Sequence, residues 1–248
     1  MIKVLVNGCN GKMGQELIAE INNDEYFEVI CGVDKDKSIE YDFNVYTDIN
    51  DIKEKPDVII DFSVPKATMN ILSYAKNNKI PIVIATTGLS EDNLNIIKKS
   101  SKEIPIFQSA NMSYDISFMK KIVAEVAKAM PDTDIEIIET HHNRKIDAPS
   151  GTALLLASSI NEALGNTKKY DFDRASRREN RNKNEIGFSS IRGGNIVGEH
   201  TVSFFGEYET FEITHRAYSR GIFAKGALKG AKYIIDKKNG LFTMDDIV

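Results

Sequence analysis

The sequence has few cysteines, no long apolar run and no large excess of charge. Its two cysteines, Cys9 and Cys31, exclude a disulfide framework and lack the spacing of metal ligands. No apolar run approaches the ~20 residues of a membrane helix, and the apolar start at 1–8 reaches a glycine too early for a signal peptide. A net charge of −4 offers no general attraction to nucleic acid or to an anionic membrane. We therefore expect a cytoplasmic protein with no nucleic-acid or membrane partner.

The chain is long enough for one large domain or two modest ones. Its 248 residues are 42% hydrophobic and 27% charged, which is ordinary for a globular protein. Short apolar stretches alternate with helical patterns through the first half of the chain, and this β-α-β-α rhythm predicts a doubly wound parallel sheet with helices on both faces. The expected strands are residues 2–6, 29–33, 57–62, 80–84 and 104–107.

A glycine loop follows the first expected strand. Gly8, Gly11 and Gly14 lead into a helical pattern, and Asp34 ends the next strand about 20 positions later, as in a βαβ dinucleotide unit. Glycines let the backbone approach a pyrophosphate, the helix start offers N–H groups, and Asp34 can accept hydrogen bonds from ribose hydroxyls. The G-x-x-G-x-x-G spacing is only moderately specific, so a tight turn without a ligand remains an alternative. Lys35 favours a 2′-phosphate and Asp34 repels one, which leaves NADH and NADPH both open.

Small polar residues follow two later strands. Residues 86–88 (Thr-Thr-Gly) come after the strand at 80–84, and residues 108–111 (Gln-Ser-Ala-Asn) come after the strand at 104–107. Ligands of doubly wound sheets lie beyond the carboxyl ends of the strands, so these tails fall where a nicotinamide ribose would lie. Each tail is a weak signal by itself because Thr, Ser and Gly are common in loops.

The segment after an expected strand at 134–140 carries unusual side chains. His141 and His142 are two of only four histidines, and Lys145 follows them. Residues 149–152 (Pro-Ser-Gly-Thr) then open a helix, whose start is a ready anion site. The segment thus offers donors for a carboxylate and a group that can donate a proton near neutral pH. A metal site lacks further ligands at suitable spacing, and an ordinary solvated loop remains an alternative.

Residues 139–153, ETHHNRKIDAPSGTA, resemble the signature of the 4-hydroxy-tetrahydrodipicolinate reductase (dihydrodipicolinate reductase) family, which is E-x-H-H-x-x-K-x-D-A-P-S-G-T-A. The resemblance implies an oxidoreductase that uses NADH or NADPH to reduce a small dicarboxylate, 4-hydroxy-tetrahydrodipicolinate, in diaminopimelate and lysine biosynthesis. It extends along nearly the whole chain. Further matching segments are 8–14, 61–65, 86–88, 190–194, 198–202 and 240–246.

The resemblance also implies residue roles. His141 would donate the proton, His142 would bind substrate, and Lys145 would contact substrate and assist proton donation. Gly151 and Thr152 would bind a substrate carboxylate, and no metal is implied. The residues that would hold the cofactor are Gly8, Cys9, Asn10, Gly11, Lys12, Met13, Asp34, Ala85, Thr86, Thr87, Ser109, Ala110, Asn111 and Met112.

The second half of the chain indicates a different kind of sheet. Expected strands between 186 and 214 alternate polar and apolar residues, and a last helix follows Ser219. The resemblance places that helix back on the nucleotide domain. It implies a dinucleotide-binding domain at 1–112 plus 220–248, an inserted α+β substrate and oligomerisation domain at 113–219, and a homotetramer built on the second domain's sheets.

Some positions depart from the family pattern. Ala85 stands where glycine is more usual, and the stretch at 36–44 is short. Asp115 is either the N-cap of a helix expected at 117–130 or a charge that perturbs the nicotinamide pocket. The stretch 168–184 is polar and poor in glycine, so we expect a mobile or solvated loop.

Two other functions are alternatives. One is a reductase that acts on another imino acid, which the histidine–lysine segment argues against. The other is a dinucleotide-binding sensor without catalysis, which intact His141 and Lys145 argue against.

Overall fold

The computed structural model describes residues 1–36 and 38–248; residue 37, within the short stretch at 36–44, lies outside them. The chain divides into two compact units. The first comprises Met1–Tyr114 with Arg220–Val248, and the second comprises Asp115–Ser219.

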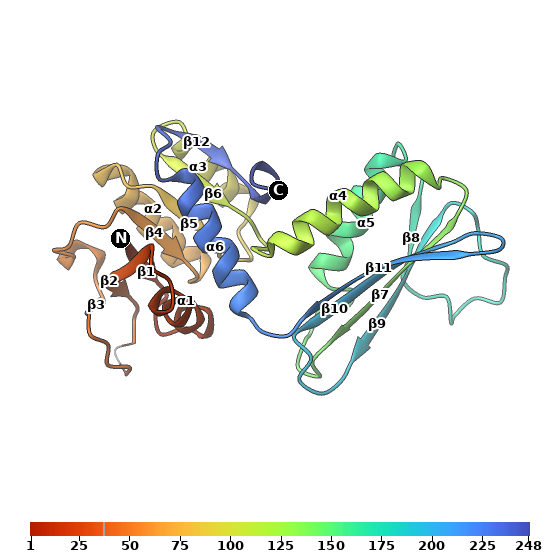
Figure 1. Cartoon of the computed structure of the whole chain (residues 1–248), viewed down its shortest axis with the longest axis horizontal. Helices are drawn as coiled ribbons and strands as arrows, with labels where there is room; N and C mark the ends of the chain where they lie inside the picture. The colour runs from red at the N-terminus through yellow and green to blue at the C-terminus, as the bar shows by residue number, and fades with distance from the viewer. Residues whose placement is uncertain (37) are drawn as a thin grey trace. The chain divides into compact units, whose positions relative to one another are not determined.

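The first unit is built on a seven-stranded sheet in which all neighbouring strands run parallel (Figure 1). Its strand order is β12-β6-β5-β4-β1-β2-β3. The five expected strands are present, and two further strands of three residues each, β3 and β12, add one edge each. The strands are β1 (Ile2–Asn7), β2 (Phe27–Val33), β3 (Asn44–Tyr46), β4 (Val58–Asp61), β5 (Ile82–Ile84), β6 (Pro105–Gln108) and β12 (Gly240–Phe242).

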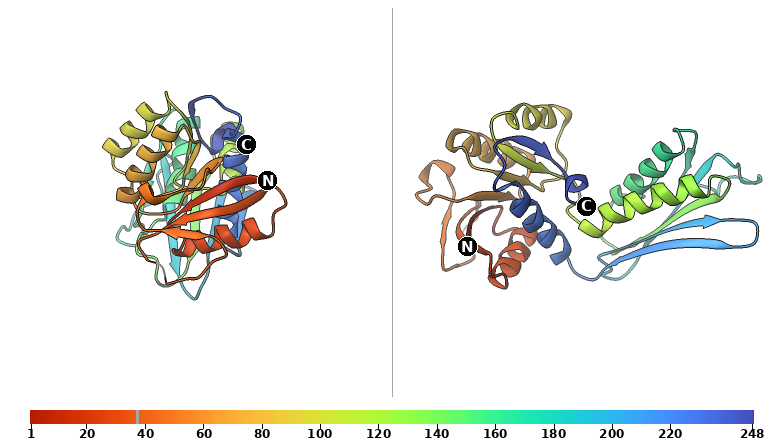
Figure 2. Two further views of the ribbon diagram at one scale, coloured as in Figure 1. Left: turned by 90° about the vertical axis from the view of Figure 1, so that its left-hand side faces the viewer. Right: turned by 45° about the horizontal axis from the view of Figure 1, so that its top comes forward.

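Helices cover both faces of this sheet (Figure 2). In β1, Val4 and Val6 pack with α1 and α6, whereas Leu5 between them packs with α2 and α3. Because both faces are buried, the central strands are continuous apolar runs. This arrangement confirms the predicted doubly wound fold. The helices are α1 (Lys12–Asn22), α2 (Pro65–Asn78), α3 (Glu91–Ser100) and α6 (Gly221–Ile234), with 3-10 turns at Ile49–Asp51 and Met244–Asp246.

Helix α6 comes from the end of the chain and completes the first unit. A Cβ at Gly226 would lie 1.6 Å from the Met112 carbonyl oxygen, and one at Gly230 would lie 2.8 Å from the Phe107 ring. Only glycine permits this approach. The helix therefore packs directly on the strand end that leads to Met112.

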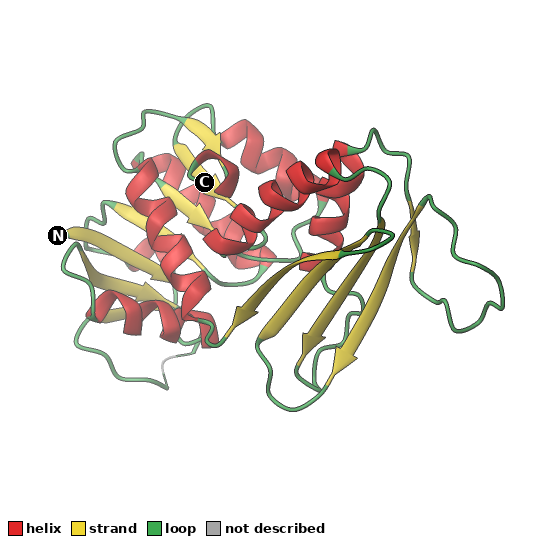
Figure 3. Cartoon of the chain, turned by 45° about the vertical axis from the view of Figure 1, so that its right-hand side comes forward, coloured by secondary structure: helices red, strands yellow, loops and turns green. Residues whose placement is uncertain are grey.

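The second unit is a mixed five-stranded sheet of order β11-β10-β7-β9-β8. Strand β7 pairs parallel with β9 and antiparallel with β10. Alternate residues such as Ile135 and Ile137 pack against Met119 of α4 and Leu156 of α5, which lie on one face of the sheet (Figure 3). The elements are α4 (Tyr114–Ala129), β7 (Asp134–His141), α5 (Gly151–Ala163), β8 (Lys169–Asp171), β9 (Glu185–Arg192), β10 (Gly198–Phe205) and β11 (Thr210–Ala217).

One local expectation is wrong and another holds for most of its range. Helix α4 begins at Tyr114, so Asp115 lies in its first turn and is not an N-cap. The polar stretch 168–184 begins with strand β8, and three of its arginines form ion pairs. Arg174 and Arg177 pair with Asp171, and Arg181 donates to Asp134 at 3.0 Å. The remainder, 172–184, contains no helix or strand and is mostly exposed, as expected for a solvated loop.

Candidate active site

The glycine loop joins β1 to α1, and the backbone segments within it lie in close contact. Gly8 has a φ of +82°, which favours glycine, and a Cβ at Gly14 would lie 2.1 Å from the Gly8 carbonyl oxygen. Gly11 precedes α1 and has no side chain to cap it. The first-turn N–H groups of α1 therefore suit an anionic ligand, as the spacing predicted.

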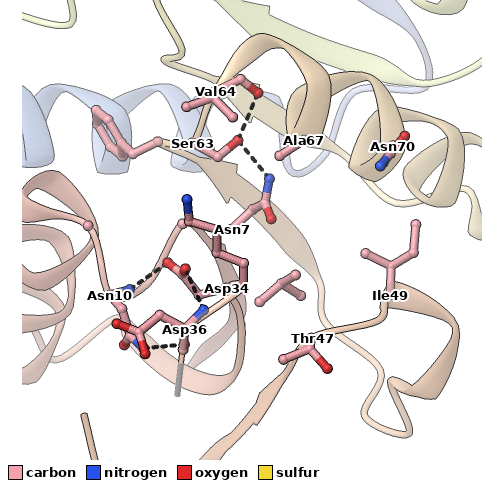
Figure 4. Close-up of a pocket in the computed structure, with 15 residues that line it drawn as sticks. Asn7, Asn10, Asp34, Asp36, Thr47, Ile49, Ser63, Val64, Ala67 and Asn70 are labelled. Atoms are coloured by element: carbon pink, nitrogen blue, oxygen red, sulfur yellow. Dashed lines mark hydrogen bonds between the residues drawn. The ribbon is translucent and has the colours of Figure 1, made fainter. Parts of the chain in front are cut away.

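A pocket of about 570 Å³ opens beside this loop. Asp34, after β2, accepts a hydrogen bond from the Asn10 N–H at 3.0 Å, and the Asp36 N–H donates to Asp34 Oδ1 at 3.2 Å (Figure 4). Lys35 also lines the pocket. The pocket's volume, its glycine loop and the carboxylates that follow β2 fit the adenosine and phosphate part of a dinucleotide.

A second pocket of about 350 Å³ lies at the ends of β4, β5 and β6. It shares Phe62 and Ser63 with the first pocket. Arg220 and Phe223 also line it; the glycine loop and strand tails gave no indication of these two, because they come from the far end of the chain. The remaining lining residues are Met13, Ala85, Thr86, Thr87, Ala110 and Met112.

Four of the expected cofactor residues line neither pocket. The Cys9 side chain is fully buried, and burial, followed by the Asp34 charge, raises the pKa of its thiol to about 12. Lys12 is exposed. The Ser109 hydroxyl donates to the Asn111 carbonyl oxygen at 2.7 Å. Their places in cofactor binding remain predictions.

A buried carboxylate, Asp61, contacts residues that line the two pockets. Asp61, with no exposed surface, accepts hydrogen bonds from Asn7 Nδ2 at 2.7 Å, Ser63 Oγ at 2.5 Å, Thr68 Oγ1 at 2.6 Å and Thr86 Oγ1 at 2.9 Å. Burial raises the pKa of Asp61, and these four donors oppose that shift. Hydrogen bonds donated to the carboxylate stabilise its ionised form, whereas burial favours the protonated form. The cluster fixes the ends of β1, β4 and β5 beside the pockets.

In the second unit, His141 is the last residue of β7 and 8% of its surface is exposed. Its Nδ1 lies 2.5 Å from Glu139 Oε2. Glu139 also accepts two hydrogen bonds from Arg192, at 2.7 and 2.8 Å, and one from the Ser150 N–H at 3.2 Å. Burial would raise the pKa of Glu139, but hydrogen bonds from Arg192, Ser190 and His141 lower it to about 2. An ionised carboxylate thus faces the histidine ring.

The His141 ring has a second neighbour in His200 of β10. The two ring centroids are 5.0 Å apart, and His200 Nε2 lies 2.9 Å from Ser150 Oγ. Burial, followed by the His141 charge, lowers the pKa of His200 to about 3, so this ring is neutral at physiological pH. Burial also lowers the pKa of His141, while Glu139 raises it.

Donors for an anion gather near this histidine. Lys145 Nζ lies 2.9 Å from Asp147 Oδ1 and is partly exposed. Ser150 caps α5 by accepting a hydrogen bond from the Ala153 N–H, and no atom lies within 4 Å of a Cβ placed at Gly151. The His142 N–H donates to the Ile196 carbonyl oxygen at 2.8 Å. A cation and an open helix start are therefore available to a carboxylate.

In the described part of the chain, no group of three or more His, Cys, Asp or Glu side chains could hold a metal ion. No helix among these residues is long and apolar enough to cross a membrane. The parallel sheet with its glycine loop and the acid–base cluster in the second unit define a nicotinamide-dependent oxidoreductase.

Comparisons with known proteins identify the family. Family models match residues 2–112 as "Dihydrodipicolinate reductase, N-terminus" and residues 115–248 as "Dihydrodipicolinate reductase, C-terminus". The chain belongs to the dihydrodipicolinate reductase family, which confirms the resemblance.

Named relatives agree. A 4-hydroxy-tetrahydrodipicolinate reductase from Caldanaerobacter subterraneus subsp. tengcongensis is 50% identical over 100% of this chain and 98% of its own. The protein of that name from Clostridium novyi is 44% identical with the same coverage. A solved structure, dipicolinate-bound dihydrodipicolinate reductase from Paenisporosarcina sp. TG-14, matches with a TM-score of 0.84 and 25% identity over 100% of both chains.

Proposed function

We propose that this chain reduces 4-hydroxy-tetrahydrodipicolinate to tetrahydrodipicolinate in diaminopimelate and lysine biosynthesis. The balance is one hydride and one proton added to the substrate, with the ring hydroxyl lost as water. Bound NADH or NADPH supplies the hydride. The first unit binds this cofactor, and the second unit binds substrate and handles the proton.

The first unit orients the cofactor through its backbone and its small residues. The glycine loop and the start of α1 hold the pyrophosphate, and Asp34 accepts hydrogen bonds from the adenosine ribose. Thr86, Thr87 and Ala110 line the smaller pocket, where the nicotinamide end lies. The further residues of this proposed site are Cys9, Lys12, Met13, Ala85, Ser109, Asn111 and Met112.

The second unit neutralises the dicarboxylate and donates the proton. Lys145 exchanges its Asp147 partner for a substrate carboxylate, and the α5 start at Gly151 and Thr152 binds a carboxylate through N–H groups. His142 adds a further substrate contact. His141 donates the proton that completes the reduction.

The observation that carries this proposal is the His141–Glu139–Arg192 cluster beside the α5 start. A dinucleotide sensor needs the pockets of the first unit but has no use for a buried acid–base pair next to an anion site. The relative with 25% identity carries bound dipicolinate, a planar dicarboxylate, which supports the same ligand class here.

A coupled assay tests the function. A synthase generates the substrate in place from pyruvate and aspartate semialdehyde, and absorbance follows oxidation of NADH and, separately, NADPH. We expect oxidation that depends on the synthase product. Folded protein that binds either cofactor without oxidising it would support the sensor, and turnover only with other imino acids would support the alternative reductase.

We also propose a cytoplasmic homotetramer formed through the second unit. Ile138, Ile191 and Phe205 are exposed on strands β7, β9 and β10. Ile138 follows Ile137 in β7 and so points away from the face that α4 and α5 cover. Light scattering after size exclusion should give four times the 27.7 kDa chain mass, and Ile138→Lys should dissociate the assembly.

A further inference from the structure

Glu139 has a position that the proposed reaction does not by itself require. Its side chain is 1% exposed and its carboxylate touches groups from three separate segments. Its Oε2 lies 2.5 Å from His141 Nδ1. Arg192 of β9 donates a hydrogen bond to each of the two oxygens, and Oε1 also accepts one from the Ser150 N–H before α5. One buried group thus contacts the proposed proton donor and the segment that opens the proposed carboxylate site.

The contacts of Glu139 determine which nitrogen of His141 carries a proton. An ionised carboxylate only accepts hydrogen bonds, so Nδ1 must carry its hydrogen toward Glu139. The exchangeable proton is then on Nε2. Among the described residues no hydrogen bond to Nε2 is found, and a Cβ at Gly198 would lie only 3.0 Å from it. The missing side chain at Gly198 keeps this nitrogen clear.

Arg192 has two roles in this cluster. Its two hydrogen bonds to Glu139 hold the carboxylate in place, and Nη2 also donates to the Asp147 carbonyl oxygen at 2.6 Å. Asp147 is the ion-pair partner of Lys145. The guanidinium therefore connects the His141 side of the site to the loop that carries Lys145.

We propose that Glu139, held by Arg192, is the positioning residue of the site: it fixes the His141 ring with Nδ1–H toward the carboxylate and leaves Nε2 as the proton-donating atom. This inference rests on the proposed role of His141 as proton donor. Glu139 touches neither substrate nor cofactor and acts only through its partners.

The charges around His141 let the proposal be tested by the direction in which each substitution shifts the pKa of His141. The groups that face the ring are Glu139 on its own strand, Lys145 in the next loop, Arg192 on β9 and the neutral His200 on β10. Glu139 raises the pKa of His141, whereas Arg192 and Lys145 lower it. Glu139→Gln should therefore lower the pKa of His141, and Arg192→Gln should raise it. A merely structural role would not give opposite shifts.

The experiment compares Glu139→Gln, Arg192→Gln and a control, Glu136→Gln. Glu136 lies on the same strand with its side chain toward the opposite face, where it pairs with Arg181 at 3.1 Å. For Glu139→Gln we expect kcat to fall on the order of 10²-fold, within the range of general acid–base catalysis, and NADH affinity to stay unchanged. The limb of the kcat–pH profile that reports the pKa of His141 should move to lower pH in Glu139→Gln and to higher pH in Arg192→Gln. Glu136→Gln should retain wild-type turnover.

Nitrogen-15 NMR of the wild-type His141 ring supplies a second measurement that needs no variant. We expect hydrogen on Nδ1 in the neutral ring and titration at Nε2. A neutral ring with its hydrogen on Nε2, or a Glu139→Gln variant with wild-type kcat and pH profile, would overturn the proposal. Wild-type protein with the expected tautomer but no turnover of the synthase product would count against the proposed function and leave the positioning intact.

Discussion

The dinucleotide pockets of the first unit and the acid–base cluster of the second differ in what builds them. Around the pockets, the lining consists mostly of backbone groups and small residues at successive strand ends. One buried carboxylate, Asp61, forms hydrogen bonds with several of them. Around His141, long charged side chains from separate strands meet in a buried network. Backbone sites are specified by glycine and by strand order, whereas the second site depends on ionised groups whose free energies respond to pH and to single substitutions.

The sharpest way to separate the two regions is His141→Gln. Loss of the proposed proton donor should lower kcat about 10²–10⁴-fold, with NADH affinity unchanged because the two pockets lie in the other unit. Steady-state rates and a fluorescence titration with NADH measure the two quantities. His215→Gln on β11 is the control. Near-normal kcat in His141→Gln would remove this residue from the chemistry.

Asp61→Asn tests the opposite unit. An amide would turn a donor toward hydroxyls that now donate to a carboxylate, and we expect a loss of about 3 kcal/mol in unfolding free energy, since buried polar groups lose their partners. NADH affinity should fall with it, because Ser63 and Thr86 line the pockets. Urea denaturation and NADH titration report both. Asp57→Asn, at an exposed carboxylate, should change neither, and an equally stable Asp61→Asn would mean that the cluster does not brace the site.

Acid titration tests how much the second unit relies on its buried ion pair. The pKa of Glu139 is about 2 in the folded chain, against 4.5 for the unperturbed group. A lowered folded pKa contributes stability above pH 4.5 that is lost as pH falls toward 2, here about 3 kcal/mol in all. The unfolding free energy of wild-type protein should therefore fall more steeply over this window than that of Glu139→Gln. Parallel slopes would show that Glu139 is not ionised in the folded chain.

The smallest expected effect concerns cofactor choice. Asp34 and Asp36 both line the larger pocket, with Lys35 between them in the chain. Removing one negative charge in Asp34→Asn should raise the kcat/KM ratio of NADPH to NADH about tenfold, or about 1.4 kcal/mol. Glu28→Gln, earlier on β2, is the control. An unchanged ratio would mean that Asp34 does not face the 2′ position.

Much of the first unit was predictable because its signals are local. Gly8 to Gly14, Asp34 and the tail at 86–88 each follow an apolar strand, and parallel strands bring their carboxyl ends to one edge of the sheet. Ser150 as the cap of α5 was predictable for the same reason, since the cap and its helix are adjacent in sequence.

Other features depend on partners distant in the sequence. Arg220 and Phe223 reach the smaller pocket only because α6 packs closely at Gly226. The ion pairs of Arg181 were not predicted, because its acidic partners Asp134 and Glu136 belong to another strand. One of the two interpretations of Asp115 made it an N-cap, but α4 begins one residue earlier, at Tyr114.

The sequence by itself determined the doubly wound fold, the glycine loop, the histidine–lysine segment and the family, because each depends on residues that are neighbours in the chain. Only the tertiary structure decided that Glu139 faces His141 and that Arg192, from another strand, holds it. Asp61 and its four donors likewise meet only when β1, β4, β5 and α2 come together. These buried groups depend on one another, because a buried charge is stable only where the fold brings its hydrogen-bond and ionic partners to it.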